Sequence, residues 1–104
     1  MYANTISSSL RIEKYYIKLL VYFTQKELSL DELYQAFYFH YMDKCPDLEK
    51  PAEEFFGEIC EKMDFTSDAA NPDEEDRKYG WIHVDEFRLW LIQYLNDNHS
   101  KLNF

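Results

Sequence analysis

Residues 47–76 read DLEKPAEEFFGEICEKMDFTSDAANPDEED, and the rest of the chain is organised around this stretch. It holds twelve of the twenty acidic residues and only two bases, Lys50 and Lys62, so it carries a net charge of −10, whereas the whole chain carries −9. Apolar residues recur in it at helical spacing, at Phe55, Phe56, Ile59 and Met63. The pattern predicts one helix and an acidic loop, with one helix face packed inward and the other presenting negative potential. The alternative interpretation is a solvated helix and a loop that only aids solubility.

The composition favours a single helical domain. A chain of 104 residues is the size of one domain, and 46 % apolar residues are enough for a core. Nine Tyr, eight Phe and two Trp supply large rings that bury much area per residue. Two Gly and three Pro leave few tight turns, which argues against a fold built on many hairpins. We therefore expect one domain over residues 1–104, with loose tails at 1–8 and 98–104.

The sharpest local signal marks the start of a second helix. Ser29 precedes an apolar rhythm and Glu32 follows three residues later, which is the spacing of a capping box. Leu28 and Leu33 occupy the positions of a hydrophobic staple. This helix should run to about Asp43, with an inner stripe of Leu30, Leu33, Phe37 and Tyr41.

Three further helices follow from the same reasoning. The first should run from Ser8 or Ser9 to about Gln25, with an apolar face at Leu10, Ile12, Tyr15, Tyr16, Leu19, Leu20 and Phe23. The third should begin near Pro51 and end near Asp64 or Phe65, and the last should span about residues 83–96. The predicted fold is all-α: a single antiparallel four-helix bundle with a long acidic loop, residues 66–80, between helices three and four. A short helical turn could start at Asn71-Pro72-Asp73-Glu74 within that loop.

Charge and cysteine content narrow the class of protein. Cys45 and Cys60 lack a metal-type spacing, and a secreted disulfide scaffold of this size usually carries more cysteines. The first nine residues are polar and no apolar run is long enough to span a bilayer, so we expect a cytoplasmic protein without membrane contact. The negative charge would repel nucleic acid phosphates, and it favours a basic protein as partner.

The sequence gives little support for a cofactor, a metal or an active site. Gly80, Ile82 and Glu86 fall at the spacing of an EF-hand calcium loop, but that register places Arg77 at a ligand position, where a guanidinium repels the cation. The three histidines are scattered, and neither cysteine has an obvious base beside it. We expect a protein that is not an enzyme and binds no cofactor.

Helix two carries more aromatic residues than one buried face can accept. Tyr34, Phe37, Tyr38, Phe39 and Tyr41 point to several sides of the predicted helix. Some of these rings should therefore remain exposed, and exposed Tyr beside acids is typical of a protein-binding surface. We expect Tyr34 and Tyr38 to be the leading candidates.

The order of features resembles the colicin D-type immunity proteins, a bacterial self-protection family that includes immunity partners of contact-dependent growth-inhibition toxins. The resemblance covers roughly residues 16–95 and rests on four segments in order: Lys26-Glu27-Leu28-Ser29-Leu30-Asp31-Glu32-Leu33, Glu53-Glu54-Phe55-Phe56, the acid-rich Glu61 to Asp76, and Ile82 through Asp85-Glu86-Phe87-Arg88. The chain departs from the family at His83, where an Asp cap is usual, and in a longer, more acidic loop.

The resemblance implies a small four-helix bundle that binds a basic, tRNA-cleaving toxin domain one to one and covers its active site with acids that stand in for tRNA phosphates. The candidate partner-binding residues are Glu54, Glu58, Glu61, Asp64, Asp68, Asp73, Glu74, Glu75 and Asp76, with the aromatic candidates Tyr34 and Tyr38. Two other classes remain open: an acidic helical adaptor or regulator of another basic protein, and a calcium-binding regulatory domain.

Overall fold

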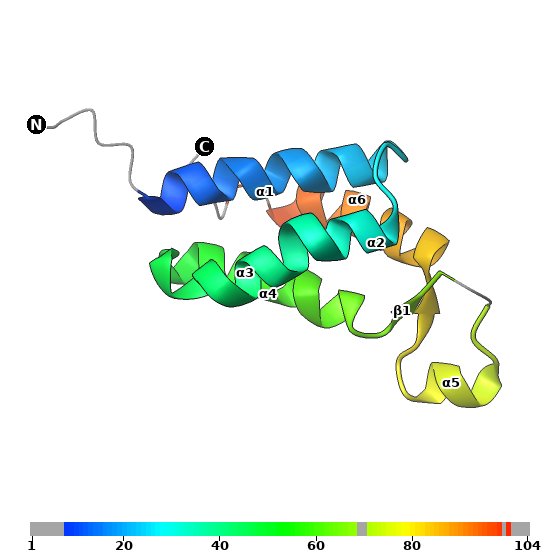
Figure 1. The fold of residues 1–104 in the computed structure, drawn as a ribbon. Helices are drawn as coiled ribbons and strands as arrows, with labels where there is room; N and C mark the ends of the chain where they lie inside the picture. Colours follow the sequence, from blue (N-terminus) through cyan, green and yellow to red (C-terminus); the bar gives the residue numbers. More distant parts are fainter. Residues whose placement is uncertain (1–7, 69–70, 99, 101–104) are drawn as a thin grey trace, which may run out of the picture.

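The computed structural model of the chain describes residues 8–68, 71–98 and 100, and within these the fold is mostly helical (Figure 1). The elements in order are α1 (Ser8–Thr24), α2 (Leu30–Leu33), the π-helical turn η1 (Tyr34–Tyr38), α3 (Phe39–Lys44), the 3₁₀ turn η2 (Cys45–Asp47), α4 (Lys50–Met63), β1 (Thr66–Ser67), α5 (Glu74–Lys78), β2 (Ile82–His83) and α6 (Val84–Asn98). The expected tails lie almost entirely outside the described residues, although Ser8 and Asn98 are helical. No described helix combines the length and the apolar character that a membrane span requires.

The second predicted helix forms one continuous helical segment, α2–η1–α3, and starts as expected. The Ser29 side chain accepts a hydrogen bond from the Glu32 N–H at 3.1 Å, and Glu32 accepts one from the Ser29 N–H at 2.8 Å. This reciprocal capping box satisfies two helix-start donors. The segment widens at η1, where the Phe39 N–H bonds to the Tyr34 carbonyl. One such π turn places an extra residue in the helix and rotates the side chains after it.

Helix α1 ends without a glycine. Lys26 takes a left-handed conformation, with φ of 65°. Its N–H bonds to the Phe23 carbonyl at 3.0 Å, and the Glu27 N–H bonds to the Tyr22 carbonyl at 2.9 Å. This is the Schellman motif, in which carbonyl groups at the helix end that lack an intrahelical partner accept hydrogen bonds from the residues that follow. Arg88 of α6 covers the same end, donating from Nε to the Phe23 carbonyl at 3.1 Å.

The core forms where α1, helix segment α2–α3, α4 and α6 meet, and the predicted inner stripes are largely confirmed. All four stripe residues of α2–α3 and all four of α4 are buried: Leu30, Leu33, Phe37, Tyr41, Phe55, Phe56, Ile59 and Met63. Tyr16 lies among them with its ring edge against Phe37 and Phe56. One predicted core residue was wrong, because Tyr15 is 43 % exposed and turns toward His40.

The segment between α4 and α6 is more than the long acidic loop with a helical turn that the sequence predicted, because it also contains a pair of short strands. Thr66 and Ser67 pair in parallel with Ile82 and His83, and the Ile82 N–H bonds to the Phe65 carbonyl at 2.9 Å. The short helix α5 begins at Asp73, whose side chain accepts the Asp76 N–H at 2.8 Å. Backbone groups in a 15-residue connection need partners, and the pairing and α5 supply them. The protein is therefore not purely helical, although the helical turn predicted near residues 71–74 is confirmed.

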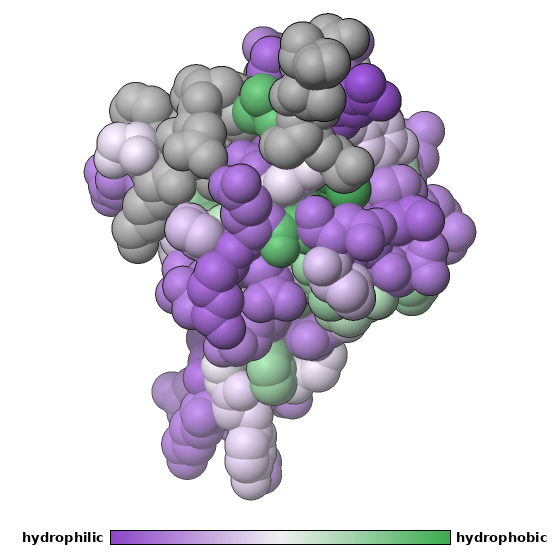
Figure 2. Space-filling model, turned by 90° about the vertical axis from the view of Figure 1, so that its left-hand side faces the viewer, coloured by the Kyte–Doolittle hydropathy of each residue, from purple (hydrophilic) through white to green (hydrophobic). Residues whose placement is uncertain are grey.

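The connection between α4 and α6, described for residues 66–68 and 71–83, forms a lobe that stands apart from the long helices. In Figure 1 the yellow α5 lies beyond β1 and β2, below the level of the other helices. Figure 2 looks at the end of the molecule that is on the left in Figure 1, and there the lobe projects downward. The surface in that view is mainly hydrophilic, with isolated hydrophobic residues.

Candidate partner-binding surface

The outer face of α4 carries a row of carboxylates that we call the acidic stripe: Glu54, Glu58 and Glu61. They follow one another at i, i+4 and i+7, which places them on the same side of the helix, and all three are exposed. The opposite face buries Phe55, Phe56, Ile59 and Met63, so the orientation of α4 is fixed by its core contacts. The sequence prediction of an inward face and an acidic outer face is therefore confirmed for this helix.

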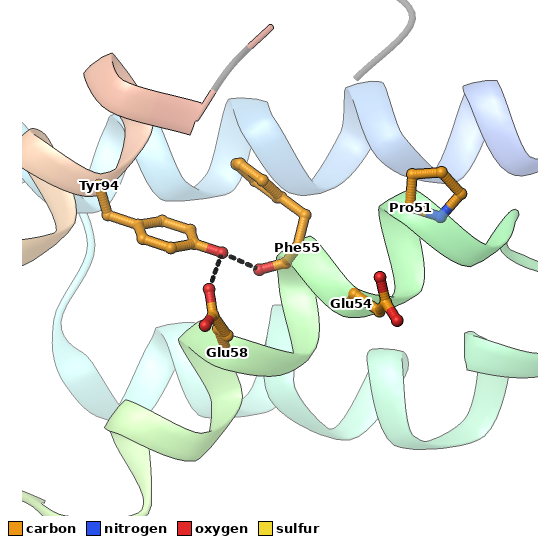
Figure 3. Close-up of a pocket in the computed structure, with 5 residues that line it drawn as sticks. All are labelled: Pro51, Glu54, Phe55, Glu58 and Tyr94. Atoms are coloured by element: carbon orange, nitrogen blue, oxygen red, sulfur yellow. Dashed lines mark hydrogen bonds between the residues drawn. The ribbon is translucent and has the colours of Figure 1, made fainter. Parts of the chain in front are cut away.

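Tyr94 of α6 holds the middle carboxylate of the stripe. Its hydroxyl lies 2.7 Å from Glu58 Oε2 and 2.8 Å from the Phe55 carbonyl oxygen, so one proton is shared between two acceptors (Figure 3). Burial, followed by the hydrogen bond to Glu58, raises the pKa of Tyr94 well above its ordinary value. The hydroxyl therefore stays protonated and keeps the Glu58 side chain in one orientation.

Tyr34 and Tyr38 form hydrogen bonds to the C-terminal end of α4. The Tyr38 hydroxyl donates to Asp64 Oδ1 at 2.6 Å, and the Tyr34 hydroxyl donates to the Met63 carbonyl. The centroids of the Tyr34 and Tyr38 rings lie 4.9 Å apart. The hydrogen bond to Asp64, followed by burial, raises the pKa of Tyr38 to about 12. The two tyrosines bring helix segment α2–α3 to the last turn of α4, where free carbonyls need donors.

The expectation that Tyr34 and Tyr38 are freely exposed is corrected by these contacts. Both side chains are half-buried, and both hydroxyls are occupied. The exposed apolar side chains of this segment are instead Phe39, at 52 %, and Met42, at 49 %. Phe39 is one of the aromatic residues that the sequence placed on this helix, whereas Met42 was not singled out, and the hydroxyl contacts of Tyr34 and Tyr38 are tertiary features that no local pattern shows.

A groove runs between the acidic stripe and α6, and we call it the α4–α6 groove. Two adjoining pockets form it, of ≈ 500 Å³ and ≈ 250 Å³, and Glu58 lines both. The described lining of the larger pocket is Pro51, Glu54, Phe55, Glu58 and Tyr94, and that of the smaller is Glu58, Glu61, Lys62, Phe65 and Trp90. Trp90 and Tyr94 stack with ring centroids 4.7 Å apart, so α6 presents a continuous aromatic wall opposite the carboxylates.

The remaining candidate acids lie beyond the C-terminal end of α4. Asp68 follows β1, and Asp73, Glu74, Glu75 and Asp76 lie in the lobe, at and within α5; all are exposed. Asp73 is engaged as the cap of α5, whereas Glu74 and Glu75 belong to its first turn. The structure therefore divides the acids of the sequence between two places, the outer face of α4 and the lobe. Tyr79, which is 71 % exposed, accompanies them at the lobe and was not singled out from the sequence.

The lobe is attached to α6 by an ion pair at the positions that had suggested a calcium loop. Arg77 donates to both oxygens of Glu86 at 3.0 Å, and the His83 N–H donates to the same carboxylate at 3.0 Å. These hydrogen bonds, with that of Arg77 the larger contribution, lower the pKa of Glu86. His83 stands where the family has an Asp cap, and it still caps α6, because its Nδ1 accepts the Asp85 N–H at 3.2 Å. The Glu86 carboxylate thus serves to anchor the lobe.

Two other reactive side chains, Cys60 and His40, pack within the fold. Cys60 is 2 % exposed, and burial raises the pKa of its thiol to about 12, so it packs as a small core residue. His40 Nδ1 lies 2.8 Å from the Tyr16 hydroxyl. Among the described residues, no group of three or more His, Cys, Asp or Glu side chains is arranged to hold a metal ion.

Comparison with models of protein families gives no match. Comparisons with curated proteins and with solved structures give none either. The functional proposal therefore depends on the sequence pattern and on the geometry of the acidic surface.

Proposed function

We propose that this protein is an immunity protein that binds and neutralises a basic, tRNA-cleaving bacterial toxin. The acidic stripe, Asp64, Asp68 and the acids of the lobe would cover the active site of the toxin in place of tRNA phosphates. The four long helical segments would then correspond to the antiparallel four-helix bundle of the colicin D-type immunity family. The protein would act in the cytoplasm as a monomer, one copy for each toxin domain.

The single observation that carries the proposal is the exposed row of carboxylates on a helix whose other face is locked into the core. A site that binds tRNA has high positive potential. A rigid acidic surface is attracted to such a site over a long range and needs little rearrangement when it binds. Tyr94 and Tyr38 support this function, because they fix the orientation of Glu58 and Asp64 before any partner arrives.

The direct test is whether the protein inhibits tRNA cleavage by the toxin domain that the proposal expects the neighbouring gene to encode. Increasing amounts of the protein should abolish tRNA cleavage with a sharp end point at one equivalent. Inhibition that continues to completion far below one equivalent would show that the protein acts as an enzyme. Binding to a basic partner that cleaves no tRNA would favour an adaptor or regulator instead.

Charge reversal tests whether the surface itself carries the binding. Replacing Glu58, Glu61, Asp64 and Asp68 together by Lys should abolish inhibition, because each change places like charges together in the interface. A matched variant with Lys at four other exposed acids, Glu27, Asp31, Asp43 and Asp97, changes the net charge equally and should keep inhibition. Equal loss in both variants would mean that net charge alone matters. Loss in neither would contradict the proposed surface.

A further inference from the structure

The larger pocket of the α4–α6 groove combines two carboxylates with an apolar wall (Figure 3). Glu54 and Glu58 come from successive turns of α4, whereas the Tyr94 ring reaches in from α6 and Phe55 and Pro51 complete the wall. The Tyr94 hydroxyl fixes Glu58, so one of the two carboxylates is already oriented. With ≈ 500 Å³, the pocket is large enough for one long side chain.

The described lining of the larger pocket carries a net negative charge. None of its five described lining residues is basic. Of the lysines along α4, Lys50 lies 3.9 Å from Glu53, and Lys62 lies over Trp90 and lines the adjoining smaller pocket instead. Two carboxylates at i and i+4 repel each other, so they favour a cation that binds between them.

The smaller pocket of the same groove already contains a basic side chain beside an aromatic ring. There the Lys62 ammonium lies 5.5 Å from the centroid of the Trp90 ring, and Glu58 and Glu61 line the same pocket. An aromatic side chain of α6 and two carboxylates of α4 thus line one pocket together with a basic side chain, whose ammonium lies over the aromatic ring. The larger pocket repeats this combination one turn away, with Tyr94 in the place of Trp90 and with Glu54 and Glu58 as the carboxylates.

We propose that the larger pocket receives an arginine side chain of the basic partner protein. The inference rests on the proposed function and adds a defined anchor point to it. The apolar rings would pack against the stem, and Glu54 and Glu58 would bind the planar guanidinium, which can donate to two carboxylates at once. A lysine ammonium fits less well, because it is more strongly hydrated and offers no planar fork.

The pocket can be tested without the partner. Nα-acetyl-arginine N-methylamide is added to the isotope-labelled protein, and the carboxyl ¹³C signals of Glu54 and Glu58 and the ring signals of Tyr94 are followed by NMR. These signals should shift and saturate at millimolar concentrations, while the neutral citrulline analogue should bind at least tenfold more weakly. Equal shifts with citrulline, or equal shifts at Glu74 and Glu75 of the lobe, would overturn the proposal. Spermidine that binds this pocket more than about tenfold tighter than the arginine probe would overturn it too, since a free polycation would then be the occupant.

The second test uses the ribonuclease domain. The pair Glu54→Gln and Glu58→Gln should raise its Kd by about 100-fold, mainly through faster dissociation. The matched pair Glu27→Gln and Asp31→Asn removes the same charge elsewhere and should change Kd less than about fivefold. Equal effects of both pairs would overturn the arginine pocket while leaving the proposed function intact. Failure of the unmodified protein to bind the ribonuclease would instead overturn the proposed function, and the arginine titration would still decide on the pocket.

Discussion

The Tyr38 hydroxyl and the Asp64 carboxylate, 26 residues apart, are joined by a hydrogen bond of 2.6 Å that connects helix segment α2–α3 to the end of α4. Tyr34 makes the neighbouring contact to the Met63 carbonyl. Because Asp64 is the C-terminal cap of α4, this pair of tyrosines fixes both the backbone and the acidic side chain at the helix end. The orientation of this carboxylate is therefore set within the protein itself.

Tyr38→Phe should lower the free energy of unfolding by about 0.5 kcal/mol, at the low end for a hydrogen bond because the pair is open to water. The pKa of Tyr38 is raised from 10.0 to about 12. The contribution of its hydrogen bond to the free energy of unfolding is therefore complete below pH 10 and disappears as the pH rises through 12. Urea unfolding at several pH values checks this. The difference in free energy of unfolding between wild type and variant should be constant from pH 7 to 9 and should shrink to zero as the pH rises above 10. A difference in stability that persists unchanged at pH 12 would contradict the role of the Tyr38 hydroxyl proton.

Ser29→Ala should cost about 0.5–2 kcal/mol of stability, because it removes the side chain that caps α2 and accepts the Glu32 N–H. Denaturant unfolding of the variant gives the value. Ser29→Asp serves as the control, since an aspartate can accept the same bond and should retain most of the stability. If the alanine variant were as stable as wild type, the capping box would contribute nothing to the fold.

Gly57→Ala should destabilise the protein by about 1–3 kcal/mol, although alanine normally favours a helix by about 1 kcal/mol over glycine. A Cβ atom at this position would lie 2.8 Å from the Tyr41 hydroxyl oxygen. That hydroxyl cannot easily retreat, because it donates to the Glu53 carbonyl at 2.7 Å. Thermal unfolding measures the change. Adding Tyr41→Phe to the variant removes the colliding oxygen, so the double variant should recover stability; a further loss would show that the clash is elsewhere.

Arg77→Ala should loosen the lobe and leave the long helices intact. The variant removes both hydrogen bonds to Glu86, whose carboxylate then keeps only the His83 N–H. Hydrogen exchange followed by mass spectrometry should quicken in residues 71–82, where the Trp81 and Gly80 amides are bonded within the lobe. Lys78→Ala, one residue along the same short helix, should leave exchange unchanged. The same acceleration in both variants would mean that the Arg77–Glu86 pair does not hold the lobe.

The sequence could predict those parts of the fold that depend on local periodicity and on caps. Ser29 with Glu32, and the apolar rhythm of α4, each specify structure within a few neighbouring residues, and both are confirmed. The left-handed Lys26 that ends α1 had no signal, because a glycine normally marks such a position. The pairing of Thr66 with Ile82 was also missed, since two strand residues on each side carry no recognisable pattern.

The same distinction applies to the candidate surface. The acidic outer face of α4 follows from spacing alone, so Glu54, Glu58 and Glu61 could be placed together in advance. The aromatic wall opposite them could not, because Trp90 and Tyr94 belong to another helix, and only tertiary packing shows that they line the groove. The hydrogen bonds from Tyr38 and Tyr94 to the acids join residues 26 and 36 positions apart, far beyond the range of a local pattern.

The π turn at Tyr34–Tyr38 gives this helix one residue more than a regular α-helix of the same span would hold. A chain shortened by one residue at this turn could close it into an ordinary α-helical turn, with Leu33 before it and Tyr41 after it still facing the core. The turn is therefore a place where evolution can change the length of the protein without unfolding it. Homologues aligned by sequence should show a one-residue gap at this point, and the side chains next to that gap, rather than the core, should differ in the surface they present.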